Sequence, residues 1–501
     1  MAEFVTLKAE GLQALRQMDE RLVSYNVEMT EVTGGTFWKA YTEAQVDGTE
    51  EFPVIKDWLT AMGKLQQWYD PIDTTNQRLI KLAKELGTAW VRVSGTWANK
   101  TYYDFDNKYE GKVPEGFQNV LSKQQWLNLL DFVKAVDGKL LVSIANCPGI
   151  HSADEPIPFE QAELLFRTSK EYGVPIAAAE FTNEPNMLEI SGLPKGYTAA
   201  DHARDHDLFG AWLKENYPEC LFVGPCTVGD IHINMGGADN NVGGGIASFT
   251  GMVTTPQLLG EYKNKLDVFS YHYYNGISER GAGMGGHWPY EQCLSEEYLA
   301  VAADCARQYV PIKEKFVPGG QMWVTESGDA GCGGNTWAST YADVPRTLNE
   351  LGEFSTVTDG VIFHNTLASS AYGFLQHGTF EPRPNYFAVL LWNRLMGKTA
   401  YATGEANRDG AHVYAHSRKD GKDGIVYLVI NNSWTETTTV ELPKKACAYV
   451  LAGEKGLRSR AMTLNGKVLA LGENDELPAM EGVAVEGKLE LAPTSCAFIV
   501  L

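Results

Sequence analysis

The chain has 501 residues, of which 44% are hydrophobic and 21% charged. This length and composition predict two or three folded domains and exclude a disordered chain. The formal net charge of −21 argues against a nucleic-acid partner, because such an acidic surface repels polyanions, and no apolar run is long enough to predict a membrane-spanning helix or a membrane partner.

Short apolar runs alternate with helix-length amphipathic segments over most of the chain. Eight runs rich in β-branched and aromatic residues predict strands, at Leu22–Met29, Ala89–Gly95, Lys139–Asn146, Ile176–Asn183, Leu221–Cys226, Leu266–Tyr274, Gln321–Glu326 and Gly360–Thr366. Helical patterns lie between most of them, for example at Thr74–Leu86, Lys123–Val136, Phe159–Tyr172 and Ala203–Asn216. Continuous apolar strands separated by helices are typical of parallel sheets, and eight such units favour an α/β fold of the (β/α)8 TIM-barrel type.

After a last helical pattern at Tyr386–Met396 the chain changes character. Short alternating runs separated by turn residues predict an antiparallel β-sandwich, with strands at His412–His416, Gly424–Asn431, Thr437–Leu442 and Cys496–Leu501. Phe4–Lys8 also alternates and is expected to add a strand to this sandwich. We therefore predict an N-terminal segment (1–20), a catalytic barrel (21–397) and a C-terminal sandwich (398–501), which either supports the barrel or binds sugar weakly.

The fourth predicted strand ends in an Asn-Glu-Pro motif. Asn183 and Glu184 place an amide beside a carboxyl at the strand end where barrel enzymes keep their active sites. Glycosidic cleavage uses such a pair, an acid for the leaving oxygen and a donor for the sugar 2-hydroxyl. A solvated glutamate ahead of a turn proline is the competing interpretation.

A second glutamate, Glu326, ends the seventh predicted strand in Thr325-Glu326-Ser327. In a barrel, the ends of the fourth and seventh strands share one rim. Carboxyl groups there can approach to about 5–5.5 Å, the separation of a retaining double displacement. Glu184 is then the general acid and Glu326 the nucleophile, provided that the pKa of Glu184 is raised and Glu326 stays ionised.

Aromatic residues on the sixth predicted strand complete this rim. His272 or Tyr273 is expected to hydrogen-bond the nucleophile, although a core aromatic cluster would have the same pattern. His272 and His287 lack the partners of a metal-binding motif, and no Gly-rich stretch has the spacing of a nucleotide-binding loop. We predict neither a metal nor another cofactor.

These segments together resemble the heparanase and β-glucuronidase family, glycoside hydrolase family 79. The resemblance covers most of the chain and, besides the two glutamate motifs, includes Arg92–Thr96, Tyr102–Asp106, His272–Gly276, Pro384–Tyr386 and Ala497–Val500. It implies a (β/α)8 glycosidase acting on β-linked glucuronic acid, with Glu184 as acid/base and Glu326 as nucleophile.

The resemblance also implies substrate contacts. Tyr372 and the adjacent backbone amide of Ala371 match the segment that recognises the uronate carboxylate, although Ser370 stands where that pattern has a glycine. Four further residues resemble contacts to the non-reducing sugar, or are ordinary polar residues at strand ends: Asn26, Glu28, Gly95 and Thr96.

The loops predicted to form the rim favour a small substrate. Asp230–Gly251 and Gly276–Gln292 contain Arg280 as their only permanent cation, whereas cutting inside a sulfated polymer calls for basic clusters. These loops instead supply apolar groups, and Trp288 is expected to contact an uncharged leaving group, with Tyr290, Met235 and Met284 beside it. We predict an exo-β-glucuronidase acting on small glucuronides or short oligosaccharides.

Three alternatives stay open at this point. The same two glutamates serve related β-xylosidases, β-glucosidases and β-galactosidases, a heparanase-like enzyme cuts inside a polymer, and a degenerate barrel would only bind carbohydrate. The eight cysteines form no CxxC pair and the charged N-terminus has no apolar leader, so we expect a cytoplasmic protein. A secreted chain whose leader had been trimmed would have the same features. The oligomeric state is not predicted.

Overall fold

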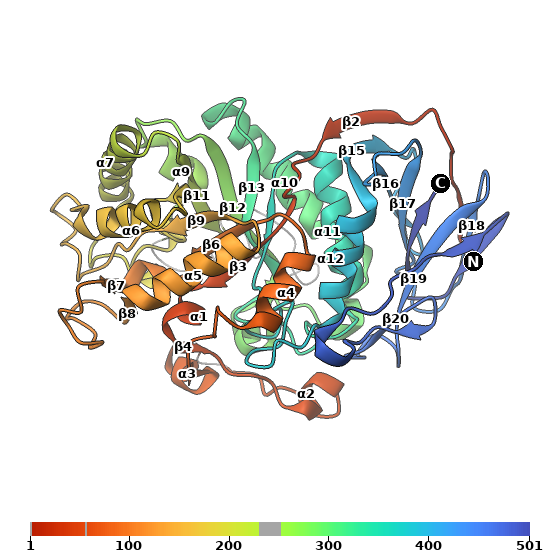
Figure 1. Ribbon diagram of the computed structural model, residues 1–501, viewed down its shortest axis with the longest axis horizontal. Helices are drawn as coiled ribbons and strands as arrows, with labels where there is room; N and C mark the ends of the chain where they lie inside the picture. Colours follow the sequence, from red (N-terminus) through yellow and green to blue (C-terminus); the bar gives the residue numbers. More distant parts are fainter. Residues whose placement is uncertain (1–2, 56–57, 230–251) are drawn as a thin grey trace.

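The computed structural model describes residues 3–55, 58–229 and 252–501. Its centre is a closed barrel of eight parallel strands (Figure 1). In barrel order these are β3 (Val23–Glu28), β6 (Trp90–Ser94), β9 (Lys139–Ser143), β10 (Ile176–Glu180), β11 (Leu221–Val228), β12 (Val268–Ile277), β13 (Met322–Gly331) and β14 (Ile362–His364). Each overlaps one of the eight predicted strands, so the predicted barrel is confirmed.

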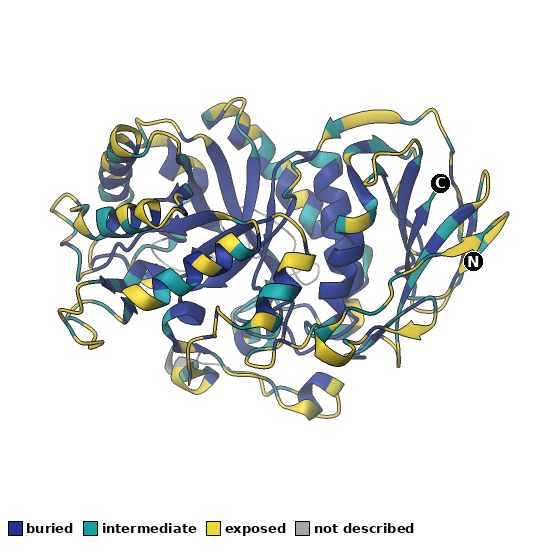
Figure 2. Ribbon diagram, in the orientation of Figure 1, coloured by how far each residue is buried: buried dark blue, intermediate teal, exposed yellow. Residues whose placement is uncertain are grey.

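One helix follows each barrel strand and packs outside it. These helices are α4 (Gln77–Glu85), α5 (Lys123–Ala135), α6 (Glu160–Glu171), α7 (Ala199–Asn216), α9 (Thr255–Gly260), α10 (Glu296–Phe316), α11 (Asp343–Val357) and α12 (Pro384–Leu395). Most have a buried side and an exposed side, dark blue and yellow in Figure 2, and their buried residues are mainly apolar. No helix in the described ranges is both long and apolar enough to cross a membrane.

The loop after β3 is the longest excursion at the start of the chain. It contains α1 (Met29–Thr33), α2 (Glu43–Asp47), α3 (Trp58–Leu65) and the hairpin of β4 (Gly35–Trp38) and β5 (Gln66–Tyr69). A small parallel pair, β7 (Thr101–Asp104) and β8 (Asn119–Ser122), follows β6. Both excursions leave from the carboxyl ends of barrel strands, where the catalytic rim is expected.

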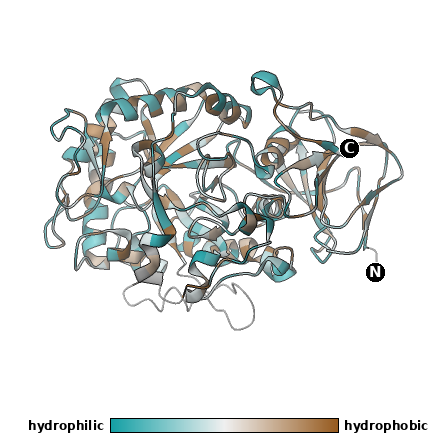
Figure 3. Ribbon diagram, turned by 90° about the horizontal axis from the view of Figure 1, so that it is seen from below, coloured by the Kyte–Doolittle hydropathy of each residue, from teal (hydrophilic) through white to brown (hydrophobic). Residues whose placement is uncertain are grey.

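Two further sheets lie beside the barrel along the long axis of the molecule (Figures 1 and 3). The larger has the order β2 (Gln13–Gln17), β15 (Met396–Ala402), β16 (His412–Arg418), β17 (Ile425–Ile430), β24 (Cys496–Val500), β19 (Ala446–Gly453), β20 (Met462–Leu464) and β21 (Lys467–Val468), with β22 (Val483–Val485) paired to β19. The smaller joins β1 (Glu3–Thr6), β18 (Thr438–Glu441) and β23 (Lys488–Leu491). β1 brings the N-terminus to this layer by pairing in parallel with β18.

The central strand β17 of the larger sheet is buried on both faces, and the alternation of its side chains shows why. Leu428 and Ile430 belong to the core shared with the barrel helices, whereas Tyr427 and Val429 belong to the core between the two sheets. Successive strand residues face opposite sides, so one strand contributes to two cores. The sheet layer is therefore packed directly against α11 and α12.

Candidate active site

The two predicted glutamates meet at one end of the barrel. Glu184 lies just beyond β10, in a left-handed backbone conformation (φ 47°), and Glu326 lies within β13. A carboxylate oxygen of Glu184 lies within 4.8 Å of one of Glu326. This separation matches the short spacing of retaining glycosidases, and is well below the 6.5–9.5 Å or so of inverting ones.

A register shift between β12 and β13 places Glu326 opposite His272. The pairing passes from Tyr271 beside Val324 to His272 beside Glu326, so β13 contributes one extra residue at this point. Such a bulge turns a strand locally and re-aims the side chains that follow. His272 and Glu326 are thereby side by side at the rim.

Three donors surround the buried carboxylate of Glu326. Tyr274 donates its hydroxyl hydrogen to Oε2 (2.8 Å), Arg92 donates from Nη1 to Oε1 (3.1 Å), and Nδ1 of His272 lies 3.5 Å from Oε2. Burial by itself raises the pKa of Glu326, but His272, the charge of Arg92 and the two hydrogen bonds outweigh burial, and the pKa is lowered. Glu326 is therefore held ionised, as a nucleophile requires.

Glu184 has the opposite balance. Its pKa is raised, chiefly because its carboxyl is removed from water and also because the negative charge of Glu326 is close; the hydrogen bond from His272 Nδ1 to Oε1 (3.0 Å) offsets part of the shift. One carboxyl is thus favoured as the acid and the other as the anion. Two neighbouring groups with pKa values pushed apart are the arrangement of acid/base chemistry.

The guanidinium of Arg92 determines how its neighbours are oriented. Nη2 donates to Asn183 Oδ1 (2.8 Å) and lies 3.2 Å from Nε2 of His272. A guanidinium can only donate, so Asn183 must present its oxygen to Arg92, and Nε2 of His272 must be the acceptor. The hydrogen of His272 is then on Nδ1, facing Glu184 and Glu326, and the buried Nδ2 of Asn183 has no hydrogen-bond partner among the described residues.

Glu184, His272 and Glu326 place three potential metal-ligand atoms within 4.8 Å of one another. Arg92 already supplies a buried positive charge to this cluster, since it bonds Glu326 and contacts His272. A divalent cation here would be repelled by the guanidinium. The donor set therefore fits a carboxyl pair held by an arginine better than it fits a metal centre.

The structure corrects the expectation for Tyr273. Its ring is buried and its hydroxyl donates to Asn275, away from the carboxyls, whereas the next residue, Tyr274, contacts Glu326. Alternate residues of a strand face opposite sides, so His272 and Tyr274 share the cleft side and Tyr273 faces the outer packing layer.

Trp288 is also corrected. The indole is 2% exposed, packs at an angle against Tyr298, and donates its N–H to the carbonyl oxygen of Asn275 (2.9 Å). It is a core residue and offers no surface to a leaving group. Of the other apolar residues predicted on these loops, Met235 lies in the 230–251 segment, outside the described residues, and the side chain of Met284 is not described either. Tyr290 is half-buried beneath Arg458.

Arg280, the expected cation of the rim, is a buried link between loops. Its guanidinium stacks on the ring of Tyr41 (3.8 Å) and donates to the carbonyl oxygens of Lys39, Cys332 and Gly334. These contacts join the excursion after β3 to the loops after β12 and β13. Arg280 is 1% exposed, so its charge is not presented to a ligand.

Asn26 and Glu28, on β3, lie beside the same cluster. Asn26 uses Nδ2 to donate to the carbonyl of Thr325 (3.0 Å) and to Asn365 (3.1 Å), while its buried Oδ1 has no partner among the residues that the structure describes. Burial, together with the charge of Glu326, raises the pKa of Glu28 well above its usual range, and in the described part of the chain the buried Oε2 of this carboxyl has no hydrogen-bond partner. Asn26 Oδ1 is therefore free to accept a hydrogen bond, and Oε2 of a protonated Glu28 is free to donate one.

Gly95 leaves room for Glu28. Its φ is +93°, and an added Cβ would lie 1.6 Å from Glu28 Oε2, so no side chain fits there. Thr96, the next residue, is half-buried. Both follow β6 at its carboxyl end.

The segment after β14 places Tyr372 in the site but uses the amide of Ala371 elsewhere. The Ala371 N–H donates to the carbonyl of Gly333 (3.1 Å), so the expected amide donor is already bonded. The hydroxyl of Tyr372 accepts from Asn365 Nδ2 (3.2 Å), which leaves its own hydrogen to donate. Ser370 has φ +60°, a left-handed conformation that favours the glycine expected there.

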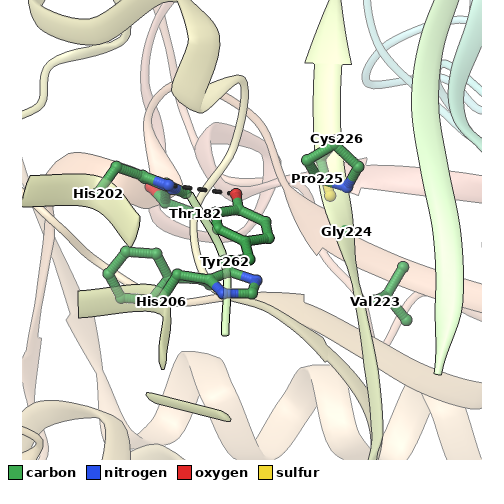
Figure 4. Close-up of a pocket in the computed structure, with 9 residues that line it drawn as sticks. Thr182, His202, His206, Val223, Gly224, Pro225, Cys226 and Tyr262 are labelled. Atoms are coloured by element: carbon green, nitrogen blue, oxygen red, sulfur yellow. Dashed lines mark hydrogen bonds between the residues drawn. The ribbon is translucent and has the colours of Figure 1, made fainter. Parts of the chain in front are cut away.

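A separate small cavity lies next to Phe181 and Thr182, just before the Asn183–Glu184 motif (Figure 4). His202 and His206 from α7 line it, and Nδ1 of His202 lies 3.2 Å from the hydroxyl of Tyr262. Burial lowers the pKa of both histidines, so they are neutral packing groups. Neither Glu184 nor Glu326 lines this cavity.

Sequence reasoning assigned no role to Arg92, Tyr274, Glu180 or Asn365. Two of them interrupt apolar strands with a charge, Arg92 in Trp90–Ser94 and Glu180 in Ile176–Glu180. A buried charge needs a partner, so two such interruptions on nearby strands are a signal that could have paired them. Asn365 carries no comparable signal.

A (β/α)8 barrel with two such carboxyls at the ends of its fourth and seventh strands is the architecture of a barrel glycoside hydrolase. Heparanase-like protein 1 of Arabidopsis thaliana is 30% identical over 276 residues, covering 47% of this chain and 50% of the relative. Baicalin-beta-D-glucuronidase of Scutellaria baicalensis is 31% identical over 250 residues, covering 47% and 45%. These alignments therefore span about half the length of each relative.

The chain is similar to members of the heparanase and β-glucuronidase family, glycoside hydrolase family 79. No family model matches it. Among solved structures, a 4-O-alpha-L-rhamnosyl-beta-D-glucuronidase from Fusarium oxysporum superposes with a TM-score of 0.63 at 12% identity, covering 99% of this chain and 100% of the other. That similarity extends the fold comparison over the barrel and the sheets together.

Proposed function

We propose that the protein is a retaining exo-β-glucuronidase that hydrolyses β-D-glucuronides of small aglycones or short oligosaccharides. The observation that carries this proposal is the Glu184–Glu326 pair, with oxygens within 4.8 Å and pKa values shifted in opposite directions. A glucuronide with a small leaving group is consistent with the Scutellaria relative, whose name specifies a β-D-glucuronidase for baicalin.

In the first step, a carboxylate oxygen of Glu326 attacks the anomeric carbon and the bond to the leaving oxygen breaks. Glu184 gives its proton to that oxygen, so the aglycone leaves as a neutral alcohol or phenol. In the second step, Glu184, now a carboxylate, takes a proton from water while the water oxygen displaces Glu326. Both carboxyls return to their starting states and the β configuration is retained.

The neighbouring groups have defined parts in these steps. The unpartnered Nδ2 of Asn183 is a donor for the sugar 2-hydroxyl, where a hydrogen bond strengthens as oxocarbenium character develops. Tyr274 donates a hydrogen bond to one oxygen of Glu326 and Arg92 donates one to the other. These two hydrogen bonds orient the carboxylate for attack.

We assign the uronate carboxylate to the part of the site formed by Tyr372 and Glu28. The free hydroxyl hydrogen of Tyr372 is one donor, and the carboxyl of Glu28, kept protonated by burial, can donate from Oε2. A neutral acid tolerates a second carboxyl group beside it, whereas an ionised one would repel it. This part of the site therefore suits a substrate that carries a negative charge.

The rim supports a small substrate rather than a sulfated polymer. In the part of Gly276–Gln292 that the structure describes, the one permanent cation is Arg280, which is buried and bonded to backbone oxygens. The Asp230–Gly251 loop, also predicted to line the rim, lies outside the described residues.

A substrate comparison tests the proposal. p-Nitrophenyl β-glucuronide should be turned over far faster than the β-glucoside, β-galactoside and β-xyloside, because these lack the carboxylate. Heparan sulfate should not be shortened internally when product sizes are followed by size-exclusion chromatography. Equal rates on the neutral glycosides, or efficient internal cutting of heparan sulfate, would contradict the proposal.

A further inference from the structure

Arg92 is bonded to two carboxylates at once, and only one of them takes part in the reaction. Its Nε donates to both oxygens of Glu180 (3.1 Å each) and its Nη2 donates to Glu180 Oε2 (2.9 Å), while Nη1 donates to Glu326 Oε1 (3.1 Å). The side chains of Arg92 and Glu180 are fully buried, and that of Glu326 is 6% exposed. Water therefore screens these interactions weakly.

Glu180 is firmly placed. It ends β10, four residues before Glu184, and accepts a hydrogen bond from Ser143 Oγ on the neighbouring strand β9 (2.6 Å). A carboxylate held by a strand end, a serine and a bidentate arginine is rigid. It does not touch the cleft, and no step of the proposed reaction uses it.

The three charges are coupled. The attraction that Arg92 exerts on Glu326 is reduced by the negative charge of Glu180, which lies on the other side of the same guanidinium. Too strong an attraction would stabilise the Glu326 carboxylate and weaken it as a nucleophile, whereas no attraction would let it take up a proton.

We infer that Glu180 is a positioning residue that sets how strongly Arg92 holds the nucleophile Glu326. This inference rests on the proposed function, because it assigns Glu326 the nucleophilic role. Glu180 acts through Arg92 and not on the substrate. Removing the negative charge of Glu180 should strengthen the electrostatic attraction between Arg92 and Glu326.

Other groups face this cluster and are constant in the comparison below. His272 and Tyr274 come from β12, Cys226 from β11, Glu28 from β3, and Glu184 from the loop after β10. None of them is altered in the variants, so a shift between variants reports Glu180 itself.

The test is the acidic limb of the pH profile of kcat/KM with p-nitrophenyl β-glucuronide, compared between the wild-type enzyme and two variants. In Glu180→Gln the limb should move to lower pH by about one unit, because a negative charge beside Glu326 is removed and Arg92 is no longer shared. In Ser143→Ala it should move to higher pH by ~0.3 unit, because Glu180 loses a donor and holds Arg92 more strongly. Glu171→Gln, an exposed residue of α6, is the matched control and should not move it.

The opposite signs separate this role from loss of structure, which would lower activity and thermal stability without moving the limb in opposite directions. An acidic limb that stays in place or moves to higher pH in Glu180→Gln would overturn the inference. An acidic limb that moves to lower pH in Ser143→Ala would also overturn it, and this second result is decisive if Glu180→Gln does not fold. If the wild-type enzyme prefers another aryl β-glycoside, the same limb is measured on that sugar. The proposed substrate would then be wrong, while the inference about Glu180 would still be tested.

Discussion

Replacing Tyr274 by Phe removes one hydroxyl from the site and leaves the ring in place. This hydroxyl donates to Glu326 Oε2 (2.8 Å) and accepts from Asn365 Nδ2 (2.8 Å). Nδ2 of Asn365 also donates to the hydroxyl of Tyr372 (3.2 Å), so it still has an acceptor in the variant. A hydrogen bond to a charged group contributes about 1.5–3 kcal/mol. Because 1.36 kcal/mol corresponds to one pKa unit, the pKa of Glu326 should rise by about one to two units.

The sign of the effect on activity follows from the ionisation that the nucleophile needs. Glu326 must be ionised to attack, so a higher pKa moves the acidic limb of kcat/KM to higher pH, while the alkaline limb, which reports the acid Glu184, should move much less. The assay is initial-rate release of p-nitrophenol at fixed ionic strength across the pH range. Because the two carboxyls are coupled, the limbs are apparent values of the pair.

Tyr273→Phe is the matched control for this prediction. It deletes the same hydroxyl from the adjacent residue of β12, whose hydrogen bond goes to Asn275. Its acidic limb should coincide with that of the wild-type enzyme even if stability falls. A Tyr274→Phe limb that stays in place, or a Tyr273→Phe limb that moves as far, would refute the reasoning.

Three further predictions follow from single contacts. Glu184→Gln should slow p-nitrophenyl β-glucuronide less than a glucuronide with a poor leaving group, since only the latter needs the proton, and equal losses measured as kcat/KM would argue against the acid role. Gly95→Ala should lower both activity and the melting temperature, because its Cβ would lie 1.6 Å from Glu28 Oε2. The control Gly87→Ala has a similar φ of +91° with nothing within 4 Å of the added Cβ, and should cost only backbone strain of about 1 kcal/mol. Equal losses of unfolding free energy in urea for the two variants would contradict this. Arg280→Met should lower the free energy of unfolding by about 2 kcal/mol by leaving buried carbonyls unpaired, and an unchanged urea midpoint would show that the link between loops is dispensable.

The barrel could be predicted because its strands are buried on both faces and therefore form continuous apolar runs. The antiparallel sheets were predicted less completely. β2 (Gln13–Gln17) is largely exposed and has no alternation of burial, so its place beside β15 depends on backbone hydrogen bonds that composition does not indicate. The runs at β16, β17, β18 and β24 were recognisable because their side chains alternate between two environments.

The catalytic pair was predictable from local motifs, whereas the residues that tune it were not. Whether Tyr273 or Tyr274 faces the cleft depends on the register of β12 beside β13, and that register shifts at His272. Trp288 was expected on the surface of a loop, but Tyr298 from α10 packs against it. Arg92 was visible as a charge in an apolar strand, and only the assembled barrel shows that it contacts Glu180 and Glu326 together.

The central claim is that Glu326 becomes covalently bonded to the sugar. It is tested most directly by incubating the enzyme with an activated 2-deoxy-2-fluoro-β-glucuronosyl substrate, digesting it, and locating the adduct by mass spectrometry of the peptides. The account predicts one glycosyl group on the peptide that contains Glu326, at the carboxyl of that residue. An adduct on another carboxyl, or first-formed product of inverted configuration by NMR, would contradict it.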